Sequence, residues 1–301
     1  MFGKIISVSL CLALCVVSGT CKDFDFQTNG LFFEVDFREG LYGMLGYSRA
    51  DNMTAGIIAN IEDVKILDLK DNSIQEIQPG AFQNLPKLKI ILLKYNDLTK
   101  IRAGTFSTVP SVTYLDLGDN NISYVDPHAF DNLTRLYSLG LDNNHLGEID
   151  SHWFEDKPDL TNIYVTGNLI KKISADQFAS LKGRKSVSLY LGDNPVETIE
   201  DDAFKGFEDL TVLSLENITL TNFTGKFLKD LKIKTLELNR NKIKCVAEED
   251  FENVFVAKTT EIMDNPLDPD CLNKIQLWVQ KHNKTVVTEC CRRLSKTAHS
   301  Q

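Results

Sequence analysis

Cysteine is the residue type in this chain whose number and spacing could do the most chemistry. The sequence holds seven cysteines, two of which, Cys11 and Cys15, lie in an apolar amino-terminal segment. The other five could form disulfides in an oxidising compartment, and they are Cys21, Cys245, Cys271, Cys290 and Cys291. They show no CxxC spacing and no partnering histidines, so a zinc site is not indicated.

Histidine and carboxylate side chains could serve catalysis, but their arrangement does not favour it. The five histidines show no metal-binding spacing, and no GxSxG, P-loop or HExxH motif occurs. The aspartates and glutamates fall at surface positions in phase with a repeat, which is typical of a solvated face. A formal net charge of −9 argues against nucleic acid, whose partners carry a basic footprint. We therefore expect no enzyme, no cofactor, no metal and no nucleic-acid partner.

The amino terminus has the pattern of a secretory signal peptide. Lys4 precedes an apolar run over residues 5–17, and the small residues 18–20 follow it. The run is shorter than the roughly 20 residues that span a bilayer. An uncleaved anchor is the alternative. No later stretch is long and apolar enough to cross a membrane, and the tail is polar, so we expect a secreted, extracellular protein without a membrane span.

Two residue types recur with one period along most of the chain. Asparagines stand 24 residues apart over four successive steps, and then 26, 47 and 24 residues apart. They are Asn72, Asn96, Asn120, Asn144, Asn168, Asn194, Asn241 and Asn265. Phenylalanines recur with the same period, at Phe82, Phe106, Phe130, Phe154, Phe178, Phe204, Phe227 and Phe251. Both sets are expected to be structural, the asparagine amides satisfying buried backbone groups and the phenylalanines filling the core.

Between these residues lies the pattern LxxLxLxxNxL in eight copies. The copies begin at Val64, Leu88, Val112, Leu136, Leu160, Ser186, Leu210 and Ile233. Alternating apolar residues indicate a short strand with one buried face, and stacked repeats would pair such strands into a parallel sheet. The pattern resembles the extracellular, 24-residue class of leucine-rich repeat. That resemblance implies an α/β solenoid, a leucine-rich-repeat horseshoe with a parallel concave β-sheet.

Two irregularities interrupt the regular spacing. Residues 182–186 lengthen one repeat by two, which predicts a small convex bulge. Ile218 stands where the repeat from Leu210 should have its asparagine, which predicts a local weak point.

Both ends of such a solenoid need caps. The predicted order is a signal peptide (1–20), an amino-terminal cap with one degenerate repeat (21–63), eight repeats (64–256), a carboxy-terminal cysteine cap (257–291) and a polar tail (292–301). The amino-terminal cap is hairpin-like, with a turn expected at Asn29-Gly30. The carboxy-terminal cap contains helical spacing over residues 272–282.

The cap cysteines allow two disulfide patterns. Adjacent cysteines rarely bond to each other, because the geometry strains the pair. The expected sets are therefore 245–290 with 271–291, or 245–291 with 271–290, and the sequence does not choose between them. Cys21 is then left over, either as a free or trimmed cysteine or as one half of an interchain disulfide.

A ligand would bind to the outward strand positions that line the concave sheet. Tyrosine is enriched at protein interfaces, and acids outnumber bases on this face. The predicted patch, for a protein with a basic surface, comprises Tyr95, Tyr114, Asp116, Asp142, Tyr164, Tyr190 and Asp193. A merely solvated polar face is the alternative. N-glycosylation sequons, some of which should carry glycans, occur at Asn52, Asn121, Asn132, Asn217, Asn222 and Asn283.

The cap points to a narrower resemblance. A single cysteine (Cys271), a tryptophan in the helical segment (Trp278) and the pair Cys290-Cys291 resemble the mosquito leucine-rich immune proteins. Those proteins form disulfide-linked pairs and hold a complement-like protein in the haemolymph, and this chain matches their short branch without a coiled coil. The resemblance implies innate immune recognition or scaffolding, with a complement-like protein or another leucine-rich-repeat chain as partner. The alternatives are a developmental or matrix protein that binds a receptor or growth factor, and an inhibitor of a foreign hydrolase.

Overall fold

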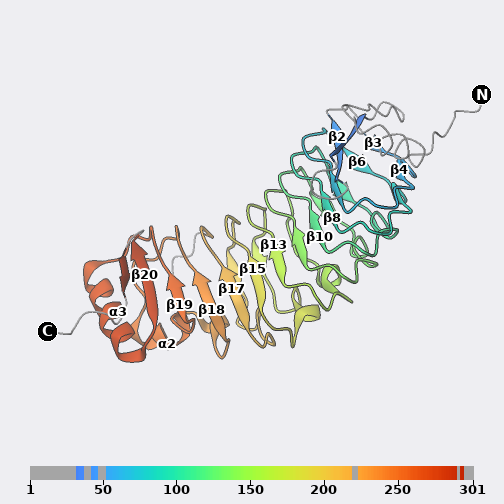
Figure 1. The fold of residues 1–301 in the computed structure, drawn as a ribbon. Helices are drawn as coiled ribbons and strands as arrows, with labels where there is room; N and C mark the ends of the chain where they lie inside the picture. Colours follow the sequence, from blue (N-terminus) through green and yellow to red (C-terminus); the bar gives the residue numbers. More distant parts are fainter. Residues whose placement is uncertain (1–31, 37–41, 47–51, 219–222, 290–291, 295–301) are drawn as a thin grey trace, which may run out of the picture. The chain divides into compact units, whose positions relative to one another are not determined.

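The computed structural model (Figure 1) describes residues 32–36, 42–46, 52–218, 223–289 and 292–294. The predicted signal peptide, the Asn29-Gly30 turn, Cys21, Asn222 and the Cys290-Cys291 pair lie outside these ranges. The chain divides into two compact units (residues 1–140 with 156–160, and 141–155 with 161–301), which we describe one at a time.

The first unit is built around one sheet with a strand from each repeat. An antiparallel hairpin, β1 with β2, begins it, and β2 then pairs in parallel with the strand of the first clear repeat. The strands in spatial order are β1 (Phe32–Asp36), β2 (Tyr42–Gly46), β5 (Ile66–Asp68), β8 (Ile90–Leu92), β10 (Tyr114–Asp116) and β12 (Ser138–Gly140). The hairpin-like amino-terminal cap is thus confirmed as a type of cap, but this hairpin pairs residues 32–36 with 42–46, and the turn expected at Asn29-Gly30 lies outside the described residues.

The second unit repeats the same plan. Its strands in spatial order are β13 (Asn162–Tyr164), β15 (Val187–Tyr190), β17 (Leu210–Ser214), β18 (Ile233–Glu237), β19 (Thr259–Glu261), β20 (Thr285–Glu289) and β21 (Arg292–Leu294). All neighbours are parallel except β20 and β21, which are antiparallel. β19 and β20 lie in the segment expected to be cap alone, so the sheet extends further than the eight clear repeats.

Short elements return the chain from one strand to the next. These connecting segments contain pairs of two-residue strands outside the main sheet. The pairs are β3 (Asn52–Met53) with β6 (Glu76–Ile77), β4 (Ile58–Ala59) with β7 (Phe82–Gln83), β9 (Lys100–Ile101) with β11 (Tyr124–Val125), and β14 (Lys172–Ile173) with β16 (Thr198–Ile199). The helical turns are η1 (Ser151–Phe154), η2 (Ala179–Leu181), η3 (Lys226–Leu228), η4 (Glu248–Asp250) and α2 (Phe251–Val254).

The repeated phenylalanines form the core behind the sheet, as predicted. In the first unit the rings of Phe82, Phe106 and Phe130 stack with centroids 6.0 and 6.2 Å apart. In the second unit Phe154 and Phe178 continue the same arrangement at 6.3 Å. All five side chains are buried. Their burial removes large apolar surfaces from water, which is the main stabilising contribution of each repeat.

The repeated asparagines form a ladder of buried hydrogen bonds. Asn194 is typical: its Oδ1 accepts from the Ile170 amide (3.1 Å), and its Nδ2 donates to the carbonyls of Val165 and Leu191 (both 2.9 Å). Asn96, Asn120, Asn168, Asn241 and Asn265 join their own turn to the preceding one in the same way. Where Ile218 replaces the asparagine, the Val196 amide turns back to the Asn194 carbonyl instead (2.8 Å), so this donor remains paired.

A helix covers the carboxy-terminal end of the second unit. α3 (Pro269–His282) begins with proline in its first turn, which suits a helix start because proline lacks an amide hydrogen. Trp278 packs against Phe251 and Phe255 with ring centroids 6.0 and 5.7 Å away, and its ring stacks on His282 at 4.1 Å. The predicted helical cap is confirmed.

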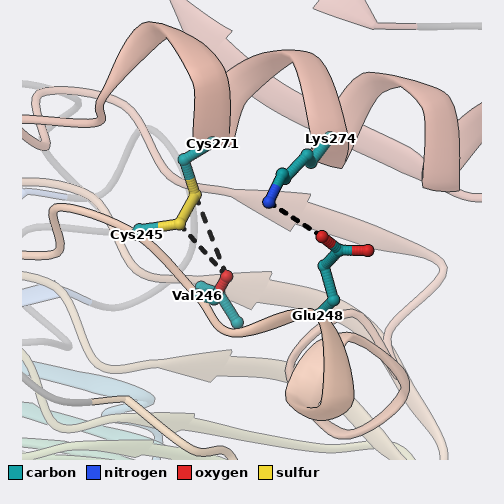
Figure 2. The surroundings of a disulfide bond; sticks show 5 residues. All are labelled: Cys245, Val246, Glu248, Cys271 and Lys274. Carbon is teal, nitrogen blue, oxygen red and sulfur yellow. Dashed lines mark hydrogen bonds and ion pairs between the residues drawn. A yellow bond between two sulfur atoms is a disulfide. The ribbon is translucent and has the colours of Figure 1, made fainter.

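The disulfide of this cap differs from both predicted patterns. Cys245 bonds to Cys271, with Cα atoms 5.5 Å apart (Figure 2). The Asp268 amide donates to the Lys244 carbonyl (2.9 Å), which holds the first turn of α3 beside the loop that carries Cys245. Both patterns were wrong because each assigned these two cysteines to the Cys290-Cys291 pair. An ion pair between Lys274 and Glu248 (2.9 Å) lies next to the disulfide (Figure 2).

Candidate ligand-binding face of the sheet

Parallel register places the outward residues of successive strands in rows. In the first unit one row aligns Ile66, Ile90 and Tyr114, and another aligns Asp68, Leu92 and Asp116. The isoleucines and Leu92 are only partly covered, and Tyr114 is exposed. We call the outward side of the strands in each unit its sheet face. The sheet face of the first unit is therefore largely apolar and aromatic.

The predicted residues of the first unit occupy different environments. Tyr95 is 53% exposed, with the Lys94 ammonium 5.6 Å from its ring centroid, within the range of a cation–π contact. Lys94 also forms an ion pair with Asp119 (2.9 Å). Asp116 uses one carboxylate oxygen to accept the Gly118 amide (3.0 Å), so part of its hydrogen-bonding capacity is used within its own turn.

Tyr95 lies at a backbone position with a special conformation. The residue before each ladder position has a positive φ, between 47° and 68°, at Asp71, Tyr95, Asp119, Asn143, Gly167, Asp193, Asn217, Arg240 and Asp264. Aspartate, asparagine and glycine tolerate this left-handed region, whereas bulkier residues are strained there. Tyr95 and Arg240 are therefore the two exceptions in this set.

In the second unit the two predicted tyrosines form one platform. Tyr164 and Tyr190 are register partners on β13 and β15, and their rings stack at 4.6 Å with planes 7° apart. Both are half-buried. Burial, and then the proximity of Tyr164 and Glu237, raises the pKa of Tyr190 above its ordinary value, so its hydroxyl remains a neutral hydrogen-bonding group near pH 7.

The same row continues into carboxylates that sequence reasoning did not select. Tyr190 aligns with Ser214, Glu237 and Glu261 through the register of β15, β17, β18 and β19. Burial raises the pKa of Glu237, the charges of Glu261 and Glu216 raise it further, and a hydrogen bond with Ser214 opposes the rise. Glu261 was missed because its strand has no LxxLxLxxNxL copy, although Asn265 follows it at the ladder spacing.

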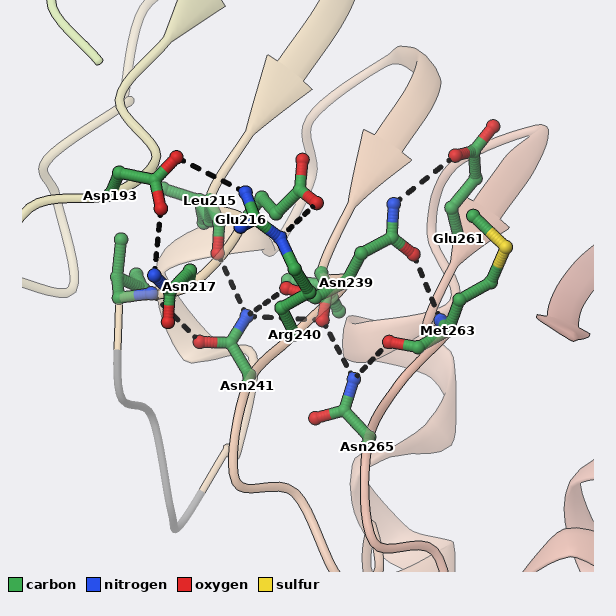
Figure 3. Close-up of polar contacts among 12 residues, drawn as sticks. Asp193, Leu215, Glu216, Asn217, Asn239, Arg240, Asn241, Glu261, Met263 and Asn265 are labelled. Atoms are coloured by element: carbon green, nitrogen blue, oxygen red, sulfur yellow. Dashed lines mark hydrogen bonds and ion pairs between the residues drawn. The ribbon is translucent and has the colours of Figure 1, made fainter. Parts of the chain in front are cut away.

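Asp193, a residue of the predicted binding patch, belongs to a network of polar side chains (Figure 3). Arg240 donates to Asp193 (3.1 Å) and to Glu216 (2.7 Å), and the side-chain Nδ2 of Asn217 donates to the other oxygen of Asp193 (2.7 Å). These charge-assisted bonds hold Arg240 in its left-handed conformation. Asp142, the remaining predicted residue, is half-buried at the turn after the sheet.

Most sequons occupy exposed positions. Asn52, Asn121, Asn132 and Asn283 are exposed, whereas Asn217 is half-buried beside Asp193. In the first unit a hollow of about 360 Å³ lies on the side of the repeats and includes Asn52 and Asn121 in its wall. Asn52 and Asn121 lie outside the strands of the main sheet.

Across the described ranges, no three histidine, cysteine, aspartate or glutamate side chains are grouped so as to hold a metal ion. In that same part of the chain, no helix has the length and apolarity needed to cross a bilayer.

Comparison with known families decides what kind of solenoid this is. The model described as "Leucine rich repeat" matches residues 44–98, 86–146, 134–183 and 187–243, which together are well over half of the chain. The chain belongs to the leucine-rich repeat family. Its strand rows and asparagine ladder are the repeat units of that family.

Solved structures support the same leucine-rich-repeat fold. The crystal structure of the mouse RP105/MD-1 complex matches with a TM-score of 0.69 and 23% sequence identity, over 83% of this chain and 44% of that chain. The leucine-rich-repeat chain thus spans less than half the length of the matched structure. Comparison with curated proteins finds no significant match.

Proposed function

We propose that this leucine-rich-repeat chain is a secreted, non-enzymatic protein that binds a basic protein surface and serves innate immune recognition or scaffolding in extracellular fluid. The observation that carries the binding proposal is the row of Tyr164, Tyr190, Glu237 and Glu261 on the second sheet face. Two stacked rings offer a flat apolar surface with polar tips, and the carboxylates add negative charge beside it. Aromatic platforms flanked by charge are typical of interface hot spots.

An arginine or lysine side chain of a partner fits this row best. A guanidinium group stacks on aromatic faces and forms two hydrogen bonds with a carboxylate. Because Glu237 is partly desolvated, a cation that pairs with it interacts more strongly than it would with a fully exposed acid.

Several observations support the extracellular setting. A disulfide joins Cys245 and Cys271, and disulfides persist in oxidising compartments. The leader-like amino terminus and the exposed sequons agree with secretion. The matched solved structure is itself a complex of two proteins. The immune role rests on the resemblance of the cap, in which Cys271 and Trp278 lie on one helix as that resemblance implies.

Affinity capture tests the binding proposal. The tagged, secreted full-length chain would be compared with the variant Tyr164→Ser/Tyr190→Ser/Glu237→Gln in native extracellular fluid. We expect the wild type to retain a specific protein and the variant to lose at least 90% of it. The control is Tyr124→Ser/Glu252→Gln, which changes an exposed tyrosine and an exposed acid away from the row. Equal capture by wild type and row variant would contradict the proposal.

Two further measurements address the biological role and the composition of the captured complex. Transcript levels that rise after infection would support the immune role, whereas constant expression in one developing tissue would support a matrix or receptor-binding role. Reducing and non-reducing gels of the eluate would show whether Cys21 joins two chains.

A further inference from the structure

Three exposed lysines gather at the amino-terminal ends of two neighbouring strands in the second unit. Lys232 immediately precedes β18, Lys234 lies on it, and Lys258 immediately precedes β19. The register pairs Thr235 with Thr259, which places Lys234 directly opposite Lys258. The Lys258 amide donates to the Ile233 carbonyl (2.9 Å), which fixes the alignment. Neighbouring strands lie about 4.8 Å apart, so the two lysines are adjacent. We call Lys232, Lys234 and Lys258 the lysine edge.

The charges of the lysine edge are not neutralised within the described part of the chain. No carboxylate oxygen there lies within 4.0 Å of the three ammonium groups. In the same unit, Lys172, Lys185 and Lys205 each have a carboxylate partner at 2.6 to 3.2 Å. Like charges directly opposite on neighbouring strands destabilise a sheet. Such an arrangement in a chain of net charge −9 indicates a surface that meets an anion.

A fourth lysine adds to the positive potential. Lys284 immediately precedes β20, and the Thr285 amide donates to the Lys258 carbonyl (3.2 Å), so Lys284 continues the lysine edge by one strand. Its ammonium donates to the Val256 carbonyl (2.6 Å) and is half-buried, which holds this charge beside the edge.

The residues next to the lysine edge select the type of anion. One position further along the strands, Thr235, Thr259 and Thr285 form a register row of half-buried hydroxyl side chains. Lysines on neighbouring strands whose backbones lie about 5 Å apart, bordered by hydroxyls and without aromatic or apolar residues in the row, suit an extended chain that carries both acidic groups and hydroxyls. An acidic protein surface would instead be met by an apolar centre.

We propose that the lysine edge binds a sulfated polysaccharide. The lysines pair with sulfate groups and the threonine row accepts and donates hydrogen bonds to sugar hydroxyls. This site is of opposite charge to the Tyr164–Glu261 row and does not depend on the protein-binding function proposed above.

Calorimetric titration of the full-length chain with a size-defined heparin oligosaccharide tests the site. We expect Lys234→Gln/Lys258→Gln to weaken binding at least tenfold at low salt. The slope of log K against log salt should fall by about two, because each lost cation releases one counterion fewer, as on DNA. The control Lys171→Gln/Lys205→Gln removes the same charge from lysines that are 69% and 73% exposed, and should bind within twofold of wild type. Lys234→Arg/Lys258→Arg should retain binding.

Three results would overturn the proposal. Heparin could fail to bind the wild type, the control could lose as much affinity as the lysine-edge variant, or polyglutamate of equal charge could bind as tightly as heparin. The last result would assign the edge to an acidic protein. Equal thermal unfolding midpoints of all variants would show that the lost affinity is not lost folding.

Discussion

At the residue scale, Tyr95 and Arg240 share a left-handed backbone conformation but differ in the contacts that accompany it. Both have a φ above +55°, at 59° and 56°, where a large side chain is strained by about 1–2 kcal/mol. At Arg240 the bonds to Asp193 and Glu216 offset part of this strain, whereas Tyr95 is 53% exposed and makes a cation–π contact with Lys94. Backbone strain at an exposed position is commonly found at functional sites.

Tyr95→Asn should therefore stabilise the protein, by about 1 kcal/mol, because asparagine tolerates the left-handed region. The matched change Arg240→Asn should not stabilise it, since it also removes two ion pairs. Urea unfolding midpoints measure both effects. Stabilisation of equal size at the two positions would show that the ion pairs of Arg240 contribute nothing.

Glu237 links stability to pH. Its pKa is raised in the folded state, so the folded protein binds this proton more readily than the unfolded chain does. The associated stability is present below the ordinary glutamate pKa and is lost as the pH rises through the raised value. Glu237→Gln should stabilise the protein at pH 7 by less than about 1 kcal/mol, because solvent screens a half-buried group.

This gain should shrink towards zero at pH 4, where Glu237 is itself protonated, and the same variant should bind a cationic partner less well. Thermal unfolding at pH 4 and pH 7 measures the stability change. The control is Glu252→Gln, at an exposed acid of α2. A stabilisation that does not depend on pH would contradict the assignment to burial of the charge.

At the element scale, the asparagine ladder should be the most sensitive part of each repeat. Asn120 accepts from the Leu98 amide (3.1 Å) and donates to the Leu93 and Leu117 carbonyls (3.0 and 3.1 Å). Asn120→Ala leaves these buried groups unpaired and should destabilise the protein by about 3–5 kcal/mol. Urea denaturation measures the loss. Asn273→Ala, on the exposed face of α3, should change stability by less than about 0.5 kcal/mol.

The disulfide holds the helical cap. Cys245 and Cys271 are 26 residues apart, so the bond closes a loop whose loss should destabilise the folded cap by about 3 kcal/mol. In Cys245→Ser/Cys271→Ser, hydrogen exchange should accelerate most in α3 and around Trp278. Amides of β5 and β8 serve as the internal reference, because each repeat is stabilised chiefly by its neighbours. Uniform acceleration along the whole chain would contradict a local role.

The sequence predicts the periodic elements well because stacked repeats turn spacing directly into contacts. Ladder asparagines and core phenylalanines 24 residues apart must lie one above the other, and the structure places them so. Pairings that do not follow the period could not be derived in this way. The bond between Cys245 and Cys271 depends on where α3 begins, and the position of Glu261 depends on a strand whose apolar residues are replaced by Thr259 and Thr260.

Part of the candidate site was also predictable from the regular alternation of the strands. Strand alternation identifies which side chains face outward, and so places Tyr164 beside Tyr190. It does not show which outward carboxylates are already paired. The pairing of Asp193 with Arg240, two repeats later, could not be seen in this way. Nor could the partial burial of Glu237, which strengthens its pairing with a cation.

At the scale of the whole molecule, two rows of opposite charge share the strands β18 and β19. Lys234 and Glu237 are three residues apart on β18, and Lys258, which immediately precedes β19, is three residues from Glu261 on that strand. Three residues of strand span about 10 Å, close to the Debye length of about 8 Å at physiological salt. The lysine edge therefore repels a cationic partner of the acidic row at low salt. A partner whose positive charges lie in a narrow strip over the acidic row is repelled least.

Removing this repulsion should strengthen the binding of cations. Lys234→Gln/Lys258→Gln should bind a tetra-arginine peptide about two- to fivefold more tightly than wild type in 20 mM salt, while it binds heparin more weakly. The gain should vanish near 1 M salt, where the Debye length is about 3 Å. Lys171→Gln/Lys205→Gln changes the net charge equally, so an equal gain there would mean that the peptide senses the total charge of the molecule and not these two rows. Fluorescence titration of a labelled peptide distinguishes the two outcomes.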